Sequence, residues 1–131
     1  MKKIIFICLT CTFLMFPNSY AQKFERKDSL RGSITKERAW WDLLHYDINV
    51  TIDLENKSVS GQNIMRYKVI QSQEELQIDL QDPMKIIRIE QDGAILTYRK
   101  EYSAHFVTMN QMQEPGSVHE IIITFEGSPV E

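Results

Sequence analysis

A strict alternation of apolar and polar residues runs through the middle of the chain. Over residues 44–54 every second residue is apolar, and the residues between are polar or charged. This period of two is typical of a β-strand with one buried and one solvent-facing side. The alternation stops at the polar segment 55–58 and resumes over residues 59–69, so the pattern predicts a long β-hairpin within residues 40–70. The side chains expected on the buried side of its first strand are Leu44, Tyr46, Ile48, Val50, Ile52 and Leu54.

Shorter strands follow the hairpin, each bounded by turn residues. Apolar residues alternate again over 76–80, and the segments 84–90 and 94–99 flank an Asp-Gly turn that predicts a second hairpin. Two more strands are expected at residues 104–109 and 118–125. About seven strands, with turn signals roughly every ten residues and no helical period among them, predict an all-β fold. We expect an antiparallel β-sandwich or a saddle-shaped double sheet.

The first residues have the three-part design of a secretory signal peptide. Two lysines form a positive start, residues 4–16 are mostly apolar, and small residues lead up to Ala21. We predict a signal peptide at residues 1–21 that is cleaved after Ala21. An uncleaved N-terminal anchor fits less well because the apolar run is short for a membrane span, and a lipoprotein signal at Cys11 lacks the usual small residue before the cysteine. The sequence therefore predicts an exported protein, periplasmic or extracellular in a bacterium.

Removal of the signal peptide limits the chemistry of the mature chain. Both cysteines, Cys8 and Cys11, lie within it, so the mature chain would have no disulfide, thiol nucleophile or cysteine metal ligand. Loss of two of the 15 basic residues leaves 13 against 18 acidic ones, a net charge of −5. A mildly acidic surface without a basic stripe argues against nucleic acid as a partner.

The mature chain divides into a polar leader and one β domain. Residues 22–39 are mostly polar and charged, and we expect them to lie over the domain surface or to be partly disordered, with a helical turn near residues 35–38. Trp40 and Trp41 follow. We interpret them as structural anchors rather than as a ligand-stacking site, because large aromatic side chains mostly contribute buried area. Residues 40–131 form the domain, expected to be incomplete at its C-terminal end because only a Gly-Ser-Pro loop follows the last strand.

The side chains predict no catalytic, cofactor-binding or metal site. His119 and Glu120 begin like the zinc motif H-E-x-x-H, but Ile123 stands in place of the second histidine. A strand would also send His119 and Glu120 to opposite faces, whereas the motif needs one helical face. His45 and His105 are isolated in the sequence. We interpret all three histidines as structural or solvent-facing.

The acidic residues and serines also lack a catalytic arrangement. Asp47 and Asp53 share a strand face, but six residues of extended strand separate them by about 20 Å, which is too far for an acid/base pair. Asp79 and Asp82 flank a turn and could bind calcium only loosely, because no EF-hand loop accompanies them. No serine lies in a Gly-x-Ser-x-Gly motif, and the glycines form no phosphate loop. The residues by themselves predict a non-catalytic β domain.

The strand sequences resemble one known family. The run L-H-Y-D-I-N-V-T-I-D at residues 44–53, followed by Val59-Ser60-Gly61, is similar to the opening of the aminopeptidase N-like zinc metallopeptidases, or gluzincin aminopeptidases. Later segments that resemble the same domain are 76–80, 86–93 and 118–127. Family members have a saddle-shaped N-terminal β domain followed by a thermolysin-like catalytic domain. The resemblance covers residues 40–131 and matches only the N-terminal domain.

The resemblance implies a function that depends on parts outside this sequence. The family's Gly-x-Met-Glu-Asn segment, its H-E-x-x-H motif with a distant glutamate, and its catalytic tyrosine have no counterpart here. The chain would be the non-catalytic N-terminal domain of an exported zinc aminopeptidase, packing on the missing catalytic domain and helping to shape its substrate cavity. Zinc and peptide substrate would bind only in the full-length enzyme.

A second interpretation stays open. The chain could be a free-standing envelope β-sandwich that binds protein or glycan. The residues that could supply stacking surfaces for such a ligand are Trp40, Trp41, Tyr98 and Tyr102.

Overall fold

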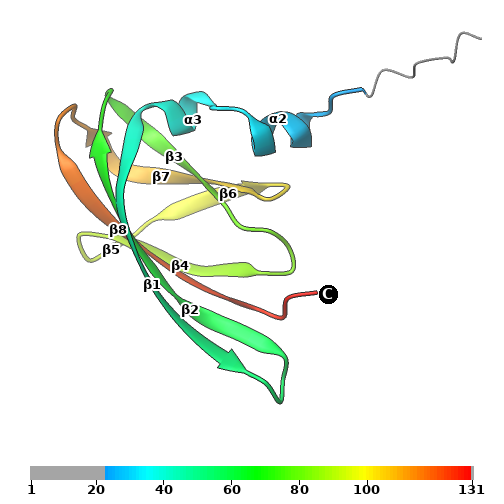
Figure 1. The fold of residues 1–131 in the computed structure, drawn as a ribbon. Coiled ribbons are helices and arrows are strands. Elements are labelled where there is room, and N and C mark those ends of the chain that lie inside the picture. The colour runs from blue at the N-terminus through cyan, green and yellow to red at the C-terminus, as the bar shows by residue number, and fades with distance from the viewer. Residues whose placement is uncertain (1–22, 131) are drawn as a thin grey trace, which may run out of the picture.

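The computed structural model describes residues 23–130 and arranges them in three layers (Figure 1). Two antiparallel sheets face each other, and two short helices lie on the outer side of the smaller sheet. The larger sheet has the strand order β1-β2-β8-β4-β5 and the smaller one β3-β7-β6. The all-β fold with two facing antiparallel sheets, predicted from the alternation, is confirmed. The predicted signal peptide lies outside the described residues.

The elements follow one another as α2 (Arg26–Gly32), α3 (Lys36–Ala39), β1 (Trp41–Asp53), β2 (Ser58–Val69), β3 (Gln73–Asp79), β4 (Lys85–Gln91), β5 (Ala94–Ile95), β6 (Thr97–Glu101), β7 (Ala104–Gln113) and β8 (Val118–Gly127).

The longest pairing is the predicted hairpin of β1 and β2. Its register runs from Trp41 opposite Val69 to Asp53 opposite Ser58, with one β-bulge near Leu43. Strand β8 pairs antiparallel with the other edge of β2. The hairpin therefore forms one edge of the larger sheet, and β1 is its outermost strand.

The second predicted hairpin, residues 84–90 with 94–99, forms only in part. Asp92 and Gly93 make the turn, both at positive φ (52° and 78°). Only two residue pairs then join β4 to β5. The chain leaves the larger sheet at Leu96, which is buried in the core, and β6 forms five residue pairs with β7 in the smaller sheet. The prediction that residues 94–99 form one strand paired with β4 is wrong. By changing sheets at Leu96, the chain buries this side chain and forms a longer ladder with β7 than β5 forms with β4.

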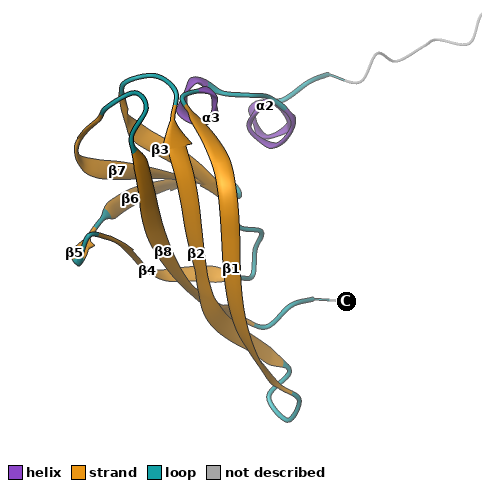
Figure 2. Cartoon of the chain, turned by 60° about the vertical axis from the view of Figure 1, so that its left-hand side comes forward, coloured by secondary structure: helices purple, strands orange, loops and turns teal. Residues whose placement is uncertain are grey.

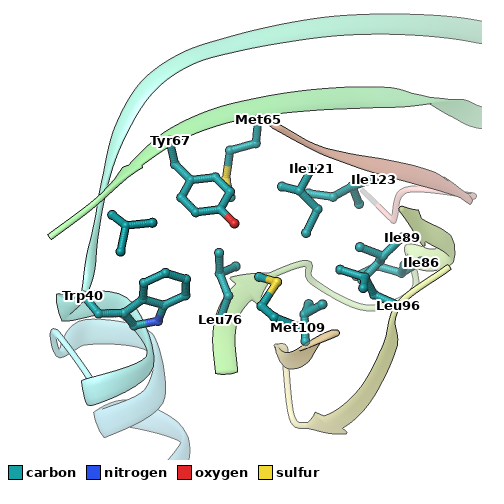
Figure 3. Close-up of a cluster of buried hydrophobic side chains, with 12 residues drawn as sticks. Trp40, Met65, Tyr67, Leu76, Ile86, Ile89, Leu96, Met109, Ile121 and Ile123 are labelled. Atoms are coloured by element: carbon teal, nitrogen blue, oxygen red, sulfur yellow. The ribbon is translucent and has the colours of Figure 1, made fainter. Parts of the chain in front are cut away.

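The hydrophobic core fills the space between the two sheets (Figure 3). Trp40 and Tyr67 meet there edge to face, with ring centroids 5.9 Å apart and planes at 89°. The Trp40 indole Nε1 donates to the Glu75 carbonyl oxygen at 2.8 Å, and the Trp41 indole Nε1 donates to the Glu37 carbonyl oxygen at 3.2 Å. Each tryptophan thus ties the start of β1 to a neighbouring element, which confirms their interpretation as anchors.

The leader segment packs on the outer face of the smaller sheet. Helix α2 buries Leu30 against Ala104 and Phe106. The buried Gln77 side chain donates to the Leu30 carbonyl oxygen at 3.2 Å and accepts a hydrogen bond from Thr35 Oγ1 at 2.7 Å. We expected this segment either to lie over the domain surface or to be partly disordered. Both helices lie over the domain surface. Helix α2 has no apolar periodicity in its sequence, so the pattern did not predict it.

Candidate functional site

The inner face of the larger sheet extends beyond the smaller sheet. Strands β1, β2 and β8 continue past the level of the smaller sheet toward the turn that joins β1 to β2 (Figure 2). The alternating apolar side chains that were expected on one buried face, from Leu44 in β1 to Leu54 in the turn after it, are instead between 43% and 85% exposed. We define the open face as the apolar inner surface of this extension, formed by Tyr46, Ile48, Val50, Ile52, Val59, Gly61 and Phe125.

The prediction that this face of β1 is buried is wrong, although its alternation is correct from Tyr46 to Ile52. At the start of the strand the β-bulge leaves Leu44 unpaired and places Leu43 opposite Tyr67. Tyr46 pairs with Met65 and Val50 pairs with Gly61, so the apolar β1 residues do share the face of the core. The smaller sheet has only three strands and covers Met65, which is buried, but not the edge strand. Alternation shows which side chains share a face, whereas the other layers of the fold decide what covers that face.

Gly61 allows an aromatic ring to lie across the centre of the open face. Val50, Gly61 and Phe125 are paired neighbours in one row across β1, β2 and β8. A Cβ atom on Gly61 would be only 3.2 Å from the Phe125 ring. The absence of a side chain at Gly61 therefore lets the Phe125 ring lie close to the backbone of β2.

An open pocket of about 570 Å³ lies where the open face meets the core. Its lining is mainly apolar, with Trp41 and Tyr46 from β1 and Ile78 from β3. Its residues are Ile34, Arg38, Ala39, Trp41, Tyr46, Asn63, Met65, Gln77, Ile78, Asp79 and Ile123. The Asn63 side-chain oxygen in this lining is buried without a hydrogen-bond partner, so it can accept a hydrogen bond from a group that enters the pocket. Partial burial raises the pKa of the Tyr46 hydroxyl.

The three histidines lie apart from one another and from the open pocket. His45 is exposed on β1. His119 Nε2 lies 2.8 Å from Ser117 Oγ. His105 is buried on β7 with its ring centroid 5.4 Å from that of Tyr98. Burial lowers the pKa of His105, and the nearby positive charge of Lys100 adds to this effect.

The described residues do not offer a zinc site. No three side chains of His, Cys, Asp or Glu gather there as a metal-binding group. His119 and Glu120 point to opposite faces of β8, because His119 pairs with Tyr67 and Glu120 with the next residue of β2 along the ladder. A structural zinc needs four protein ligands and a catalytic zinc needs three. Residues 23–130 bring no such set together in this structure.

Three of the four acidic residues singled out in the sequence, Asp53, Asp79 and Asp82, have local structural partners. Asp53 accepts hydrogen bonds from the backbone and side chain of Asn56 in the β1–β2 turn, which lower the pKa of Asp53. Asp79 forms an ion pair with Arg38. Asp82 forms one with Lys100, which lowers the pKa of Asp82. Asp79 and Asp82 therefore each face a basic side chain.

A buried polar cluster that the sequence pattern did not predict is formed by Tyr67, Gln91 and Gln113. The Tyr67 hydroxyl accepts a hydrogen bond from Gln91 Nε2 at 2.9 Å and donates to Gln113 Oε1 at 3.2 Å. Gln113 Nε2 donates to the Gln111 carbonyl oxygen at 3.0 Å. Burial raises the pKa of Tyr67 to about 12. One feature of the sequence could have predicted this cluster. Gln91 and Gln113 stand at positions that the alternation of β4 and β7 directs into the core. Since these hydrogen bonds are internal, the cluster holds the core together.

The four aromatic residues of the envelope-module interpretation do not form one stacking surface. Trp40 is buried, and the Tyr98 hydroxyl donates to the Ile86 carbonyl oxygen at 3.0 Å. Tyr102 lies 58% exposed in the β6–β7 turn. Separately, no helix in residues 23–130 is long and apolar enough to cross a membrane.

The fold matches solved structures of zinc metallopeptidases. The M1 zinc metallopeptidase of Deinococcus radiodurans matches with a TM-score of 0.62 at 16% identity, over 70% of this chain and 21% of that chain. A mutant of that enzyme bound to a Tyr-Ser-Ala substrate gives 0.63 at 16% identity, over 72% and 22%. Native yeast leukotriene A4 hydrolase gives 0.56 at 19% identity, over 67% and 14%. No protein-family model and no curated protein matches the sequence.

These matches confirm the resemblance to the aminopeptidase N-like zinc metallopeptidases at the level of the fold. The chain spans about a fifth or less of the length of the enzymes it matches. Each match covers most of this chain but only a small part of the enzyme, which is consistent with an N-terminal domain.

Proposed function

We propose that this chain is the non-catalytic N-terminal β domain of an exported zinc aminopeptidase. In this role it packs on a thermolysin-like catalytic domain and helps to form the wall of the substrate cavity. The observation that carries the proposal is the open face, a band of exposed apolar side chains continuous with the core, on a fold shared with zinc metallopeptidases.

The open face has the chemistry of a domain interface. Contiguous exposed apolar surface on a soluble domain usually marks an interaction site, and its burial contributes roughly 25 cal/mol per Å². Tyr46, Ile48 and Val50 present such a surface next to the open pocket. A catalytic domain packed there would have this pocket at its boundary. That position supports a role in shaping the substrate cavity.

Zinc belongs to the other domain in this proposal. In the catalytic domain, zinc binds to an H-E-x-x-H motif with a distant glutamate, and the amino terminus of the peptide substrate binds to a Gly-x-Met-Glu-Asn segment. Export is the part of the proposal that rests on residues 1–21.

The DNA that follows codon 131 provides the most direct test. The proposal expects a continuous reading frame with Gly-x-Met-Glu-Asn and then H-E-x-x-H. Absence of both motifs from every frame downstream would contradict it.

Enzyme kinetics on the longer protein provide the second test. Val50→Asp places a charge on the open face, and we expect it to lower kcat/KM for aminoacyl-p-nitroanilides at least tenfold because the two domains no longer pack. Thr51→Asp is the matched control, since Thr51 lies on the opposite face of the same strand, and it should stay within about twofold of the parent. Robust turnover by residues 22–131 alone with added zinc would overturn the non-catalytic assignment.

A further inference from the structure

Strand β1 has a free backbone edge along its whole length. It is the terminal strand of the larger sheet and pairs only with β2 among the described residues. The backbone N–H and C=O groups of a strand alternate in direction, so about half of the groups of this 13-residue strand point away from β2. Long unpaired edges of this kind are templates for another strand.

The edge has little of the usual protection against strand addition. Proteins commonly guard edge strands with lysine, proline, short length or bulges. Strand β1 contains no Lys, Arg or Pro. Its one bulge lies near its start, at Leu43, which leaves His45 to Asp53 as a regular edge of nine residues. The edge can therefore accept a partner strand of similar length.

The two faces of this edge have different chemistry. The inner face presents the apolar side chains of Tyr46, Ile48, Val50 and Ile52. The outer face carries Asp47 and Asp53, together with polar residues and His45. None of the ion pairs within residues 23–130 involves a β1 residue. The Asp47 carboxylate is thus available to a cation on a neighbouring strand, whereas the Asp53 carboxylate also accepts hydrogen bonds from Asn56.

We propose that the β1 edge binds, by β-augmentation, an extended segment with apolar side chains on one face and Lys or Arg on the other. Its backbone completes the free ladder, its apolar side chains lie beside Ile48 and Val50, and its basic side chains lie beside Asp47 and Asp53. The segment belongs to the same longer protein, outside residues 1–131. The assignment of the segment to the same longer protein rests on the proposed function. The alternation of apolar and basic side chains in the segment goes beyond that function.

A second copy of the chain is a poorer occupant. Over residues 45–53, two β1 strands side by side would share an outer face whose acidic groups are the carboxylates of Asp47 and Asp53, with only His45, Asn49 and Thr51 beside them. Like charges opposite each other are destabilising, and no Lys or Arg of β1 would offset them. Charge complementarity therefore selects a basic segment over self-pairing.

Peptide binding to residues 22–131 tests the chemistry of the edge. The probe is a nine-residue peptide of alternating Val and Lys with blocked ends, followed by backbone amide NMR and fluorescence anisotropy. We expect shift changes concentrated at residues 45–53, binding at least tenfold tighter than that of an alternating Val and Glu peptide, and loss of binding when alternate peptide nitrogens are methylated. Equal binding of the two peptides, or shifts centred on another strand, overturns the proposal.

A charge reversal supplies the matched variant. Asp47→Lys should weaken binding of the Val and Lys peptide at least tenfold and improve binding of the Val and Glu peptide, whereas Glu114→Lys in the β7–β8 loop should change neither. A dimer that forms through β1 without peptide would instead favour a second copy and overturn the proposal. These outcomes do not depend on the downstream reading frame, so they separate the edge chemistry from the proposed peptidase.

Discussion

Asn49 and Gly61 lie so close across the β1–β2 ladder that a Cβ atom on Gly61 would be 2.2 Å from the Asn49 carbonyl oxygen. This contact is with backbone, which cannot rotate away. We expect Gly61→Ala to lower the free energy of unfolding by about 1–3 kcal/mol because the two strands must separate locally. Urea unfolding measures this, with Gly32→Ala in open space as the control, which should change stability by less than about 0.5 kcal/mol. An unchanged Gly61→Ala variant would contradict the close packing.

The open face should make the isolated domain bind hydrophobic dyes. Ile48 is 58% exposed, so Ile48→Lys should leave the unfolding free energy within about 0.5 kcal/mol of the parent. The same change should reduce 8-anilinonaphthalene-1-sulfonate fluorescence at least twofold and reduce self-association in sedimentation. Thr51→Lys, on the opposite face, is expected to leave both signals unchanged. A large loss of stability in Ile48→Lys would show that Ile48 is buried.

Tyr67 should make the domain sensitive to alkaline pH. Its folded-state pKa of about 12 lies above the ordinary value of 10, so the folded state favours the neutral phenol. This stability is fully present below pH 10 and is lost as the pH rises toward 12, by on the order of 2 kcal/mol. Tyr67→Phe should flatten the urea-unfolding profile above pH 10 while costing about 1–2 kcal/mol at pH 7 through the lost hydrogen bonds. Tyr102→Phe should leave the alkaline slope intact, and a slope that persists in Tyr67→Phe would exclude Tyr67 as its source.

His105 should contribute sensitivity to mild acid. Its folded-state pKa is lowered first by burial and then by Lys100, with Asp82 opposing. The folded state therefore favours the neutral imidazole, and stability falls as the pH drops below the ordinary histidine value of about 6.5. We expect His105→Phe to reduce the loss of stability between pH 7 and pH 5. His45→Gln on the exposed face of β1 serves as the control, and an identical acid profile in His105→Phe would refute the assignment.

The strand pattern predicted most of the larger sheet but not how it is covered. The alternation from Tyr46 to Ile52 correctly assigned side chains to faces, because that property is local to the strand. Whether the face is buried depends on the width of the smaller sheet, which joins residues far apart in the sequence. The corner at Leu96 was missed for a similar reason, since two strands of different sheets are separated there by a single residue without a turn signal.

The sequence predicted the candidate site less well than it predicted the fold. The residues chosen for their chemistry, such as His119 and Asp79, lie in separate structural contacts. The residues that form the open face were recognised only as a predicted core. Gly61 was noted as part of the family resemblance, and its role beside Phe125 required the pairing of β2 with β8.

We expect the corner at Leu96 to make the two sheets open as one cooperative unit. Residues 94–101 belong to both sheets without a loop between them, so neither sheet can open at this corner while the other keeps its strand in place. Slow amide exchange in β2 and in β7 should then report the same global opening rather than two separate subglobal ones. The uncovered end of the β1–β2 hairpin lies away from this corner, so we expect its amides to exchange faster than those of the core strands. The part of the domain with the most exposed apolar surface would then also be the part that adjusts most easily to a partner.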